Sequence, residues 1–145
     1  MPEKETLERA KKDKEAGKAP STQAGEFVRE EIEHVREGKH GARSAKQAIA
    51  IGLSKARRAG VNLKPPKKGS KKIRKQAARD LKKGKSQSKK KSAQRSRTTA
   101  QALKREGHRA ASKRALSRQA HAAARKRSAA SRSRSAKKAA KTRKK

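Results

Sequence analysis

The stretch SAKQAIAIGLSKARRAG, residues 44–60, contains the clearest helix signal in the sequence. Its alanine, isoleucine, glycine and leucine residues recur every three or four positions, which places them on one face of a helix. Ser44 followed by Gln47 fits a capping box, and Gly60 stands where a C′ glycine belongs. We therefore predict a helix over 45–59, with a face of small residues that lets a second helix approach closely.

A second apolar face lies just upstream of this helix. Val28, Ile32 and Val35 are spaced i, i+4 and i+7, which predicts a helix over 23–37 that ends at Gly38. The connection to the following helix is short, as in antiparallel helical hairpins. The predicted fold class is therefore mainly α, with a short helical hairpin as its core and no β-sheet.

Residues 1–22 form a charged leader ahead of the hairpin core, which we place at 23–63. The leader mixes acidic and basic helix formers, but Leu7 is its only large apolar residue. An isolated helix with one apolar anchor would be marginal. The GKAPS run then breaks it, and Ser21 or Thr22 can cap the helix that follows.

Residues 64–97 contain a Pro-Pro pair near their start and are interpreted as a basic linker with one short helix. Apolar residues recur every four positions from Ile73 to Leu81. They predict the short helix over 70–83, with Gly84 as its stop.

The remainder of the chain is rich in alanine and basic residues. Residues 98–127 favour a basic helix that Gly107 interrupts, and 128–145 is a low-complexity tail expected to be disordered when free. The sequence thus predicts extensive disorder, with a basic arm that is partly helical. REGKHGARSAKQA at 36–48 and REGHRAASKRA at 105–115 share an REG run before a basic, alanine-rich segment, which does not by itself establish a repeat.

Charge is distributed very unevenly along the chain. It has 47 Lys and Arg against 12 Asp and Glu, a formal net charge of +35. Residues 1–40 sum to −1 and residues 41–145 sum to +36. Each lysine or arginine placed on a phosphate releases condensed counterions and adds affinity that does not depend on base sequence. We therefore expect sequence-independent binding of double-stranded DNA, and its condensation, through phosphate neutralisation.

The predicted nucleic-acid-binding residues are basic side chains near the helix at 45–59 and along the arm. Residues 28–145 have no aromatic side chain on which a base could stack, which favours contact with the duplex backbone over single-strand binding. The predicted residues are Arg43, Lys46, Lys55, Arg57, Arg58, Lys64, Lys67, Lys68, Lys71, Lys72, Arg74, Lys75, Lys104, Arg105, Arg109, Lys113, Arg114, Arg118, Arg125, Lys126 and Arg127.

Two alternative functions stay open on the sequence alone. One is an RNA-binding or ribosome-associated basic protein, since arginine-rich segments also bind RNA. The other is an adaptor whose hairpin binds an unknown protein partner while the arm tethers it to nucleic acid. No membrane association is expected, because the apolar run at 48–53 is too short to span a bilayer and the start of the chain is too charged for a secretory signal.

Catalytic and metal chemistry are not predicted, and neither is a cofactor. The sequence has no cysteine, and its four histidines are scattered. Glu30 and His34 share an i, i+4 spacing, but we expect them on an exposed helix face rather than around a metal. No Ser/His/Asp motif is recognisable, so enzymatic activity is not expected.

Residues 26–69, EFVREEIEHVREGKHGARSAKQAIAIGLSKARRAGVNLKPPKKG, resemble a family of small, basic bacterial proteins with a core of the form KHGARSAKQAIAIGLSKARRAG. Members of that family are described as DNA-binding or plasmid-stabilisation proteins. The tail SAKKAAKTRKK at 135–145 is similar in composition to the tails of linker histones and bacterial histone-like proteins. The family resemblance implies a bacterial setting. Together with the basic composition, it leads us to expect a histone-like, nucleoid-associated protein of the bacterial cytoplasm.

Overall fold

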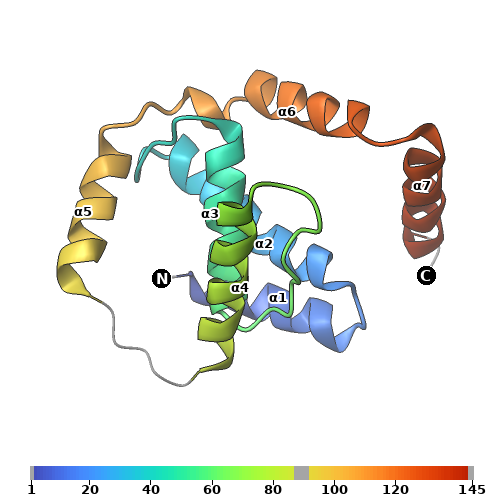
Figure 1. The fold of residues 1–145 in the computed structure, drawn as a ribbon, viewed down its shortest axis with the longest axis horizontal. Helices are drawn as coiled ribbons and strands as arrows, with labels where there is room; N and C mark the ends of the chain where they lie inside the picture. The colour runs from blue at the N-terminus through green and yellow to red at the C-terminus, as the bar shows by residue number, and fades with distance from the viewer. Residues whose placement is uncertain (1, 87–91, 144–145) are drawn as a thin grey trace.

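The computed structural model describes residues 2–86 and 92–143, and all regular secondary structure in these ranges is helical (Figure 1). The mainly α fold without a sheet is thus confirmed for the described part of the chain. None of these helices combines the length and the apolar character that a bilayer crossing requires. In chain order the elements are α1 (Lys4–Glu15), α2 (Pro20–Arg36), α3 (Ala45–Arg58), α4 (Lys71–Lys85), α5 (Ala93–Lys104), the short 3-10 helix η1 (Arg109–Ala111), α6 (Lys113–Arg125) and α7 (Ala129–Arg143).

Helices α2 and α3 pack as the predicted antiparallel hairpin, and their backbones come very close at Gly52. A Cβ atom added to Gly52 would lie 2.6 Å from the Cα of Val28 and 2.9 Å from the carbonyl oxygen of Phe27. No side chain fits in that space. Gly52 therefore sets the distance between the two helices.

The ends of α3 follow the sequence signals. Ser44 Oγ accepts a hydrogen bond from the backbone N of Gln47 at 3.2 Å, and Gly60 has a positive φ of 99°. The backbone N of Val61 donates to the carbonyl of Ala56 at 3.1 Å, and the two side chains share a core cluster. These contacts confirm the predicted capping serine and C′ glycine.

Helix α2 starts earlier than predicted. Pro20 is its first residue and follows Ala19, which makes no side-chain cap, so the expected cap at Ser21 or Thr22 is wrong. Proline suits a first helical position because its fixed φ is already helical and its missing N–H would have no partner there. The predicted end is confirmed, since Gly38 has a positive φ of 76° after the C-cap residue Glu37.

The core consists of two small apolar clusters built mostly from alanine, because the sequence supplies few large apolar residues. The first joins α1, α2, α3 and the loop after α3: Ala10, Ala24, Phe27, Ala56 and Val61, with Leu53 and Leu63 packed against them. The second joins the end of α2, the start of α3 and η1: Val35, Ala42, Ala48, Ala110 and Ala111, with Ile32 against them.

The leader is part of the fold, which the sequence did not indicate. Helix α1 packs on α2 and buries Thr6 and Ala10, whereas Leu7, its expected apolar anchor, is 40% exposed. Polar contacts hold the helix in place, including an ion pair of 2.9 Å between Arg9 Nε and Glu26 Oε2. Apolar periodicity gives no signal for this kind of docking.

The predicted helix over 70–83 is confirmed as α4, but Gly84 does not stop it. The helix runs through Gly84 to Lys85, and a Cβ at Gly84 would lie 2.0 Å from the carbonyl oxygen of Arg57. Gly84 is therefore a contact point between α4 and the end of α3. A packing glycine and a stop glycine look the same in sequence.

The arm is anchored to the hairpin, and the two REG segments lie against each other. Backbone N of Gly41 donates to the carbonyl of Leu103 at 2.9 Å, and Arg36 Nε donates to the carbonyl of Ala111 at 2.9 Å. The Nδ1 of His108 lies 2.9 Å from the carbonyl of Val35. These contacts fix η1 on the end of the hairpin.

Helices occupy more of the arm than predicted. Helix α5 begins at Ala93, inside the predicted linker, and the break at Gly107 is confirmed between α5 and α6. The tail expected to be disordered contains α7, whose alanine, lysine and arginine residues have high helix propensity. In the described residues, the structure therefore does not show the extensive disorder that the sequence predicts. Residues 87–91 of the predicted linker and 144–145 of the predicted tail lie outside the described residues.

We predict that Gly52→Ala destabilises the fold by about 1–3 kcal/mol, because the added methyl group meets backbone atoms that cannot rotate away. The matched control is Gly25→Ala in α2, where a Cβ has no neighbour within 4 Å. That change should stabilise by about 0.5–1 kcal/mol through helix propensity. Urea unfolding followed by circular dichroism measures both. Equal effects of the two substitutions would contradict the close approach at Gly52.

Candidate nucleic-acid interface

Helix α4 is a strongly basic helix that packs on the core. It has eight basic residues and one acidic residue in fifteen positions. All eight basic side chains are exposed, whereas Ala77 and Asp80 are buried in the contact with α3. At about 100° per residue, the basic positions fall on the half of the helix opposite Ala77, Asp80 and Gly84. Helix α4 therefore presents a continuous cationic face about 22 Å long.

The one acidic residue of α4 holds the helix on α3. Asp80 accepts hydrogen bonds from Ser54 Oγ at 2.7 Å and from Arg58 Nε at 2.7 Å. Gln76 Nε2 donates to the same carboxylate at 3.1 Å. The buried carboxylate is thus satisfied inside the contact. Its negative charge is paired there and leaves the outer face of α4 uniformly basic.

Two of the predicted binding residues are not free on the surface. Arg57 is 8% exposed, its Nε donates to the carbonyl of Leu63 at 3.0 Å, and burial lowers its pKa. Lys55 Nζ lies 2.6 Å from Glu31 Oε2 and 3.4 Å from Glu30 Oε1. Both cations therefore hold the core together rather than extend the exposed basic surface.

The other predicted residues are exposed. Arg43 Nε lies 3.8 Å from Glu106 Oε1 but its side chain is 81% exposed. The structure does not gather all of them on one face, because they lie in the connection before α3, on α3, on the loop before α4, on α4 itself and along the arm. They are Arg43, Lys46, Arg58, Lys64, Lys67, Lys68, Lys71, Lys72, Arg74, Lys75, Lys104, Arg105, Arg109, Lys113, Arg114, Arg118, Arg125, Lys126 and Arg127.

Several exposed basic residues were missed from the sequence. On α4 the helical spacing from Lys71 and Lys75 could have found them, because residues three, four and seven apart share a face. On α7 the expectation of disorder hid them. On these helices and on α5, the missed residues are Arg79, Lys82, Lys83 and Lys85 on α4, Arg95 and Arg97 on α5, and Arg132, Arg134, Lys137, Lys138, Lys141 and Arg143 on α7.

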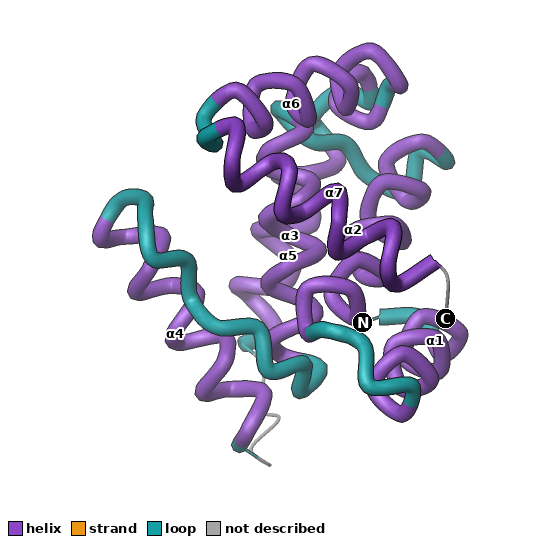
Figure 2. Tube along the Cα trace, turned by 90° about the vertical axis from the view of Figure 1, so that its right-hand side faces the viewer, coloured by secondary structure: helices purple, strands orange, loops and turns teal. Residues whose placement is uncertain are grey.

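Helices α5, α6 and α7 bury no residue of their own. Figure 1 shows α5 on one side of the α1–α4 core and α6 with α7 on the other, and Figure 2 shows that α6 is helical and is linked to its neighbours by loops. None of the three helices contains an acidic residue. These helices therefore carry basic side chains with no acidic residue among them, and the docked η1 lies between α5 and α6.

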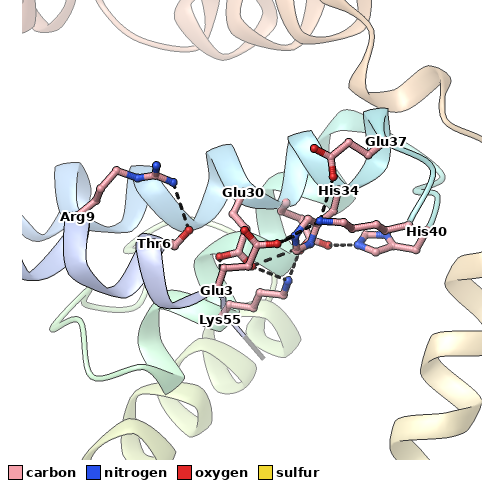
Figure 3. Close-up of polar contacts among 10 residues, drawn as sticks. Glu3, Thr6, Arg9, Glu30, His34, Glu37, His40 and Lys55 are labelled. Atoms are coloured by element: carbon pink, nitrogen blue, oxygen red, sulfur yellow. Dashed lines mark hydrogen bonds and ion pairs between the residues drawn. The ribbon is translucent and has the colours of Figure 1, made fainter.

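A second polar site lies on the opposite, near-neutral part of the chain, between α1, α2 and α3 (Figure 3). Glu30 and Glu31 are 2% and 0% exposed, so the expectation that this face of α2 is exposed is wrong. His34 Nε2 lies 2.9 Å from Glu3 Oε1, and Lys39 Nζ lies 3.1 Å from the same atom. Hydrogen bonds from His34 and Lys39 hold the pKa of Glu3 below its usual value.

Aromatic stacking is not available to this chain. The sequence contains one phenylalanine, Phe27, and no tryptophan or tyrosine. Phe27 lies in the first core cluster and is 1% exposed. Proteins that bind single strands without sequence preference usually stack bases on exposed aromatic rings. The exposed basic surface therefore offers charge and hydrogen bonds but no aromatic platform for bases.

Residues 11–68 match the model of a family of unknown function, DUF6496. The matched span holds the end of α1, the α2–α3 hairpin and the loop before α4, and it stops short of α4 and the arm. The chain is similar to that family over this span. No curated protein and no solved structure matches the chain.

We predict that Asp80→Ala loosens α4 and costs about 1–3 kcal/mol of stability, because Ser54, Arg58 and Gln76 lose their shared acceptor. Amide exchange should become faster through α4 first. The control is Glu15→Ala, which removes an exposed ion pair with Lys11 and should change stability by less than about 0.5 kcal/mol. Unchanged protection of α4 in Asp80→Ala would show that another contact docks the helix.

Proposed function

We propose that this protein binds double-stranded DNA without sequence preference, through phosphate contacts centred on the basic face of α4. The observation that carries the proposal is the arrangement of charge on that helix. Its eight basic side chains are exposed and its one acidic side chain is buried and paired. Solubility alone does not require such a density of like charge, which disfavours the compact state through self-repulsion.

The length of the face suits a DNA backbone. Phosphates of one strand follow each other about every 3.4 Å along the duplex axis, so a face of about 22 Å extends over about six of them. Lys64, Lys67 and Lys68 lie on the loop that leads into α4 and are also exposed. Because α4 is docked through Asp80 and Gly84, its cations are held in position before DNA binds. A docked helix loses less conformational entropy on binding than a free basic segment does.

The arm would add contacts beyond this face. Helices α5, α6 and α7 bury no residue, and like charges on successive turns oppose helix formation in the free protein. Phosphates remove that repulsion, so DNA should stabilise the helices of the arm. Helix α5 lies before η1, and helices α6 and α7 lie after it. One molecule can therefore contact two stretches of DNA backbone, one on each side of η1. In this proposal the protein is histone-like, associates with the nucleoid of a bacterial cell and condenses DNA.

Duplex DNA is favoured over single strands because the chain exposes none of the aromatic side chains that single-strand binders use. Sequence preference is not expected, because the proposed contacts are made by charges on phosphates rather than on base edges. RNA binding stays the alternative, since arginine planes also stack on unpaired bases.

We predict that removing four charges from α4, as Lys71→Ala, Lys75→Ala, Arg79→Ala and Lys82→Ala together, makes the salt dependence of DNA affinity shallower. The slope of log K against log salt should fall in magnitude by about 3 to 4, close to 0.9 for each lost phosphate contact. Fluorescence anisotropy with a labelled duplex at several salt concentrations measures the slope. A scrambled duplex should give the same values as the original one.

The control removes the same number of charges from α1, as Lys4→Ala, Lys11→Ala, Lys12→Ala and Lys14→Ala, all of them exposed. For that variant, the slope of log K against log salt should differ by less than about 1 from the slope of the unmodified protein, because long-range attraction is screened at physiological salt. Equal losses in the two variants would mean that net charge alone governs binding. Competition with duplex RNA and single-stranded RNA of equal length tests the alternative, and stronger competition by either RNA would contradict the preference for DNA.

A further inference from the structure

The cluster on α2 brings together three side chains of the types that bind metal ions. Glu31 and His34 are i and i+3 on α2, and His40 follows in the connection to α3. One ligand atom from each lies within 4.8 Å of the other two. The side chains of Glu31, His34 and His40 are 0%, 11% and 17% exposed. The cluster is therefore enclosed, in contrast to the basic surface of the rest of the chain.

Both ring nitrogens of His40 face acceptor oxygens. Nδ1 lies 3.1 Å from the carbonyl of Gly41, and Nε2 lies 3.1 Å from Glu31 Oε1. A neutral imidazole has one N–H and one lone pair. If Nδ1 carries the hydrogen, the Nε2 lone pair points at a carboxylate oxygen. That arrangement is favourable only with a cation between the two atoms, which is either a proton or a metal ion.

His34 is also surrounded by carboxylates. Its Nε2 lies 2.9 Å from Glu3 Oε1, and its Nδ1 lies 4.0 Å from Glu30 Oε1. Metal-bound histidines commonly donate their second ring N–H to a carboxylate, which fixes the ring and raises its basicity as a ligand. If Nδ1 binds a metal, Glu3 is such a partner. If Nε2 binds it, Glu3 Oε1 is close enough to join as a fourth ligand.

The charge of the cluster matches a divalent cation. Its carboxylates belong to Glu3, Glu30, Glu31 and Glu37, and its ammonium groups to Lys39 and Lys55. With neutral imidazoles these four acids and two bases leave a net charge of −2. A single divalent ion would neutralise it.

Glu31 has two buried carboxylate oxygens with different partners. Neither oxygen accepts a hydrogen bond of regular geometry from the described residues, so each relies on an ionisable neighbour. Lys55 Nζ forms an ion pair with Oε2 at 2.6 Å, and Oε1 faces His40. A buried carboxylate without hydrogen bonds is costly unless a charged group compensates it. Oε1 is the atom that a metal ion would use.

We propose that Glu31, His34 and His40 bind one divalent transition-metal ion, zinc first, with a fourth position left for Glu3 or water. Ligand atoms about 2.0–2.1 Å from a tetrahedral zinc are about 3.3 Å apart. The separation of 3.1 Å between His40 Nε2 and Glu31 Oε1 already fits this value. His34 lies at the rim of the cluster, where its ligand atom is within 4.8 Å of the other two, so it completes the site by moving up to about 1.5 Å.

The ion would fix the connection between α2 and α3. His40 directly precedes Gly41 and Ala42, whose backbone N atoms donate to the carbonyls of Leu103 and Gly107 at 2.9 Å and 3.1 Å. The same short connection therefore holds both the cluster and the anchor of the arm. Metal binding at His40 should order this connection and, through it, the docking of η1. The site is independent of the proposed DNA binding by α4.

The test uses the full-length chain without a histidine tag and free of nucleic acid. Zinc titration by calorimetry should give one ion per chain, and Co²⁺ should give the visible absorption of a tetrahedral site. At a zinc concentration about a hundredfold above Kd, the melting temperature should rise by about 10 °C. His34→Gln and His40→Gln should each weaken zinc binding more than about tenfold. The matched control, His121→Gln on the exposed face of α6, should leave it unchanged.

Long-range ¹H–¹⁵N spectra of the histidine rings in the unmodified protein give a second readout that needs no variant to fold. Zinc should shift the ring nitrogens of His34 and His40 and leave those of His108 and His121 in place. The proposal is overturned if zinc does not bind at one ion per chain, or if its binding survives His40→Gln. It is also overturned if the shifted rings are those of His108 or His121, which would mean an adventitious ion only.

Discussion

The close approach of α3 to α2 at Gly52 is the contact on which the rest of the structure depends. The sequence offers one aromatic residue and few large aliphatic ones, so a core at ordinary helix spacing would be underfilled. A glycine with no room for a Cβ lets the two backbones come together until alanine-sized side chains fill the space. The two clusters of alanines, with Phe27, Val35 and Val61, then complete a small core.

Because this core is thin, buried polar pairs supply the remaining contacts between helices. Asp80 connects α4 to α3, Glu30 and Glu31 connect α2 to Lys55 of α3, and Glu26 connects α2 to α1. Buried ion pairs add less net stability than apolar groups of the same size, but losing one partner is costly, so they favour one arrangement of the helices. The same pairs remove acidic side chains from the surface. The outer faces of α4 and the arm are left almost purely basic.

Helix–helix contacts and charge thus divide the molecule into two parts with different roles. The near-neutral head packs, and it contains the carboxylate–histidine cluster. The anchors of the basic part that pack without polar contacts are small, namely Ala77 and Gly84 on α4 and Ala110 and Ala111 in η1, and hydrogen bonds such as those of Asp80 add to them. Each of these packing anchors is an alanine or glycine, so a basic segment can dock closely and still keep its long cationic side chains in solvent. Alanine and glycine therefore do two things in this chain. They form most of the core, and they attach the exposed basic helices to it.

The sequence by itself determined those helices and helix ends whose signals lie within one or two helical turns of the chain. The helix at 45–59, its Ser44 cap and Gly60 end, the apolar face of α2 and the basic helix after the Pro-Pro pair all follow from spacing and capping within one turn or two. The uneven distribution of charge is also a property of the sequence alone. These features predicted the mainly helical fold and many of the exposed basic residues after residue 40.

Only the tertiary structure decided which of those residues are exposed and which distant segments meet. Lys55 and Arg57 look like their neighbours in sequence, but their partners Glu31 and Leu63 are brought to them by the hairpin and the following loop. The docking of α1 and η1 uses one or two alanines and polar atoms, which produce no apolar period. The meeting of Glu31, His34 and His40 depends on the path of the connection after α2. Each of these depends on distances between elements, and residue spacing along one helix contains no information about such distances.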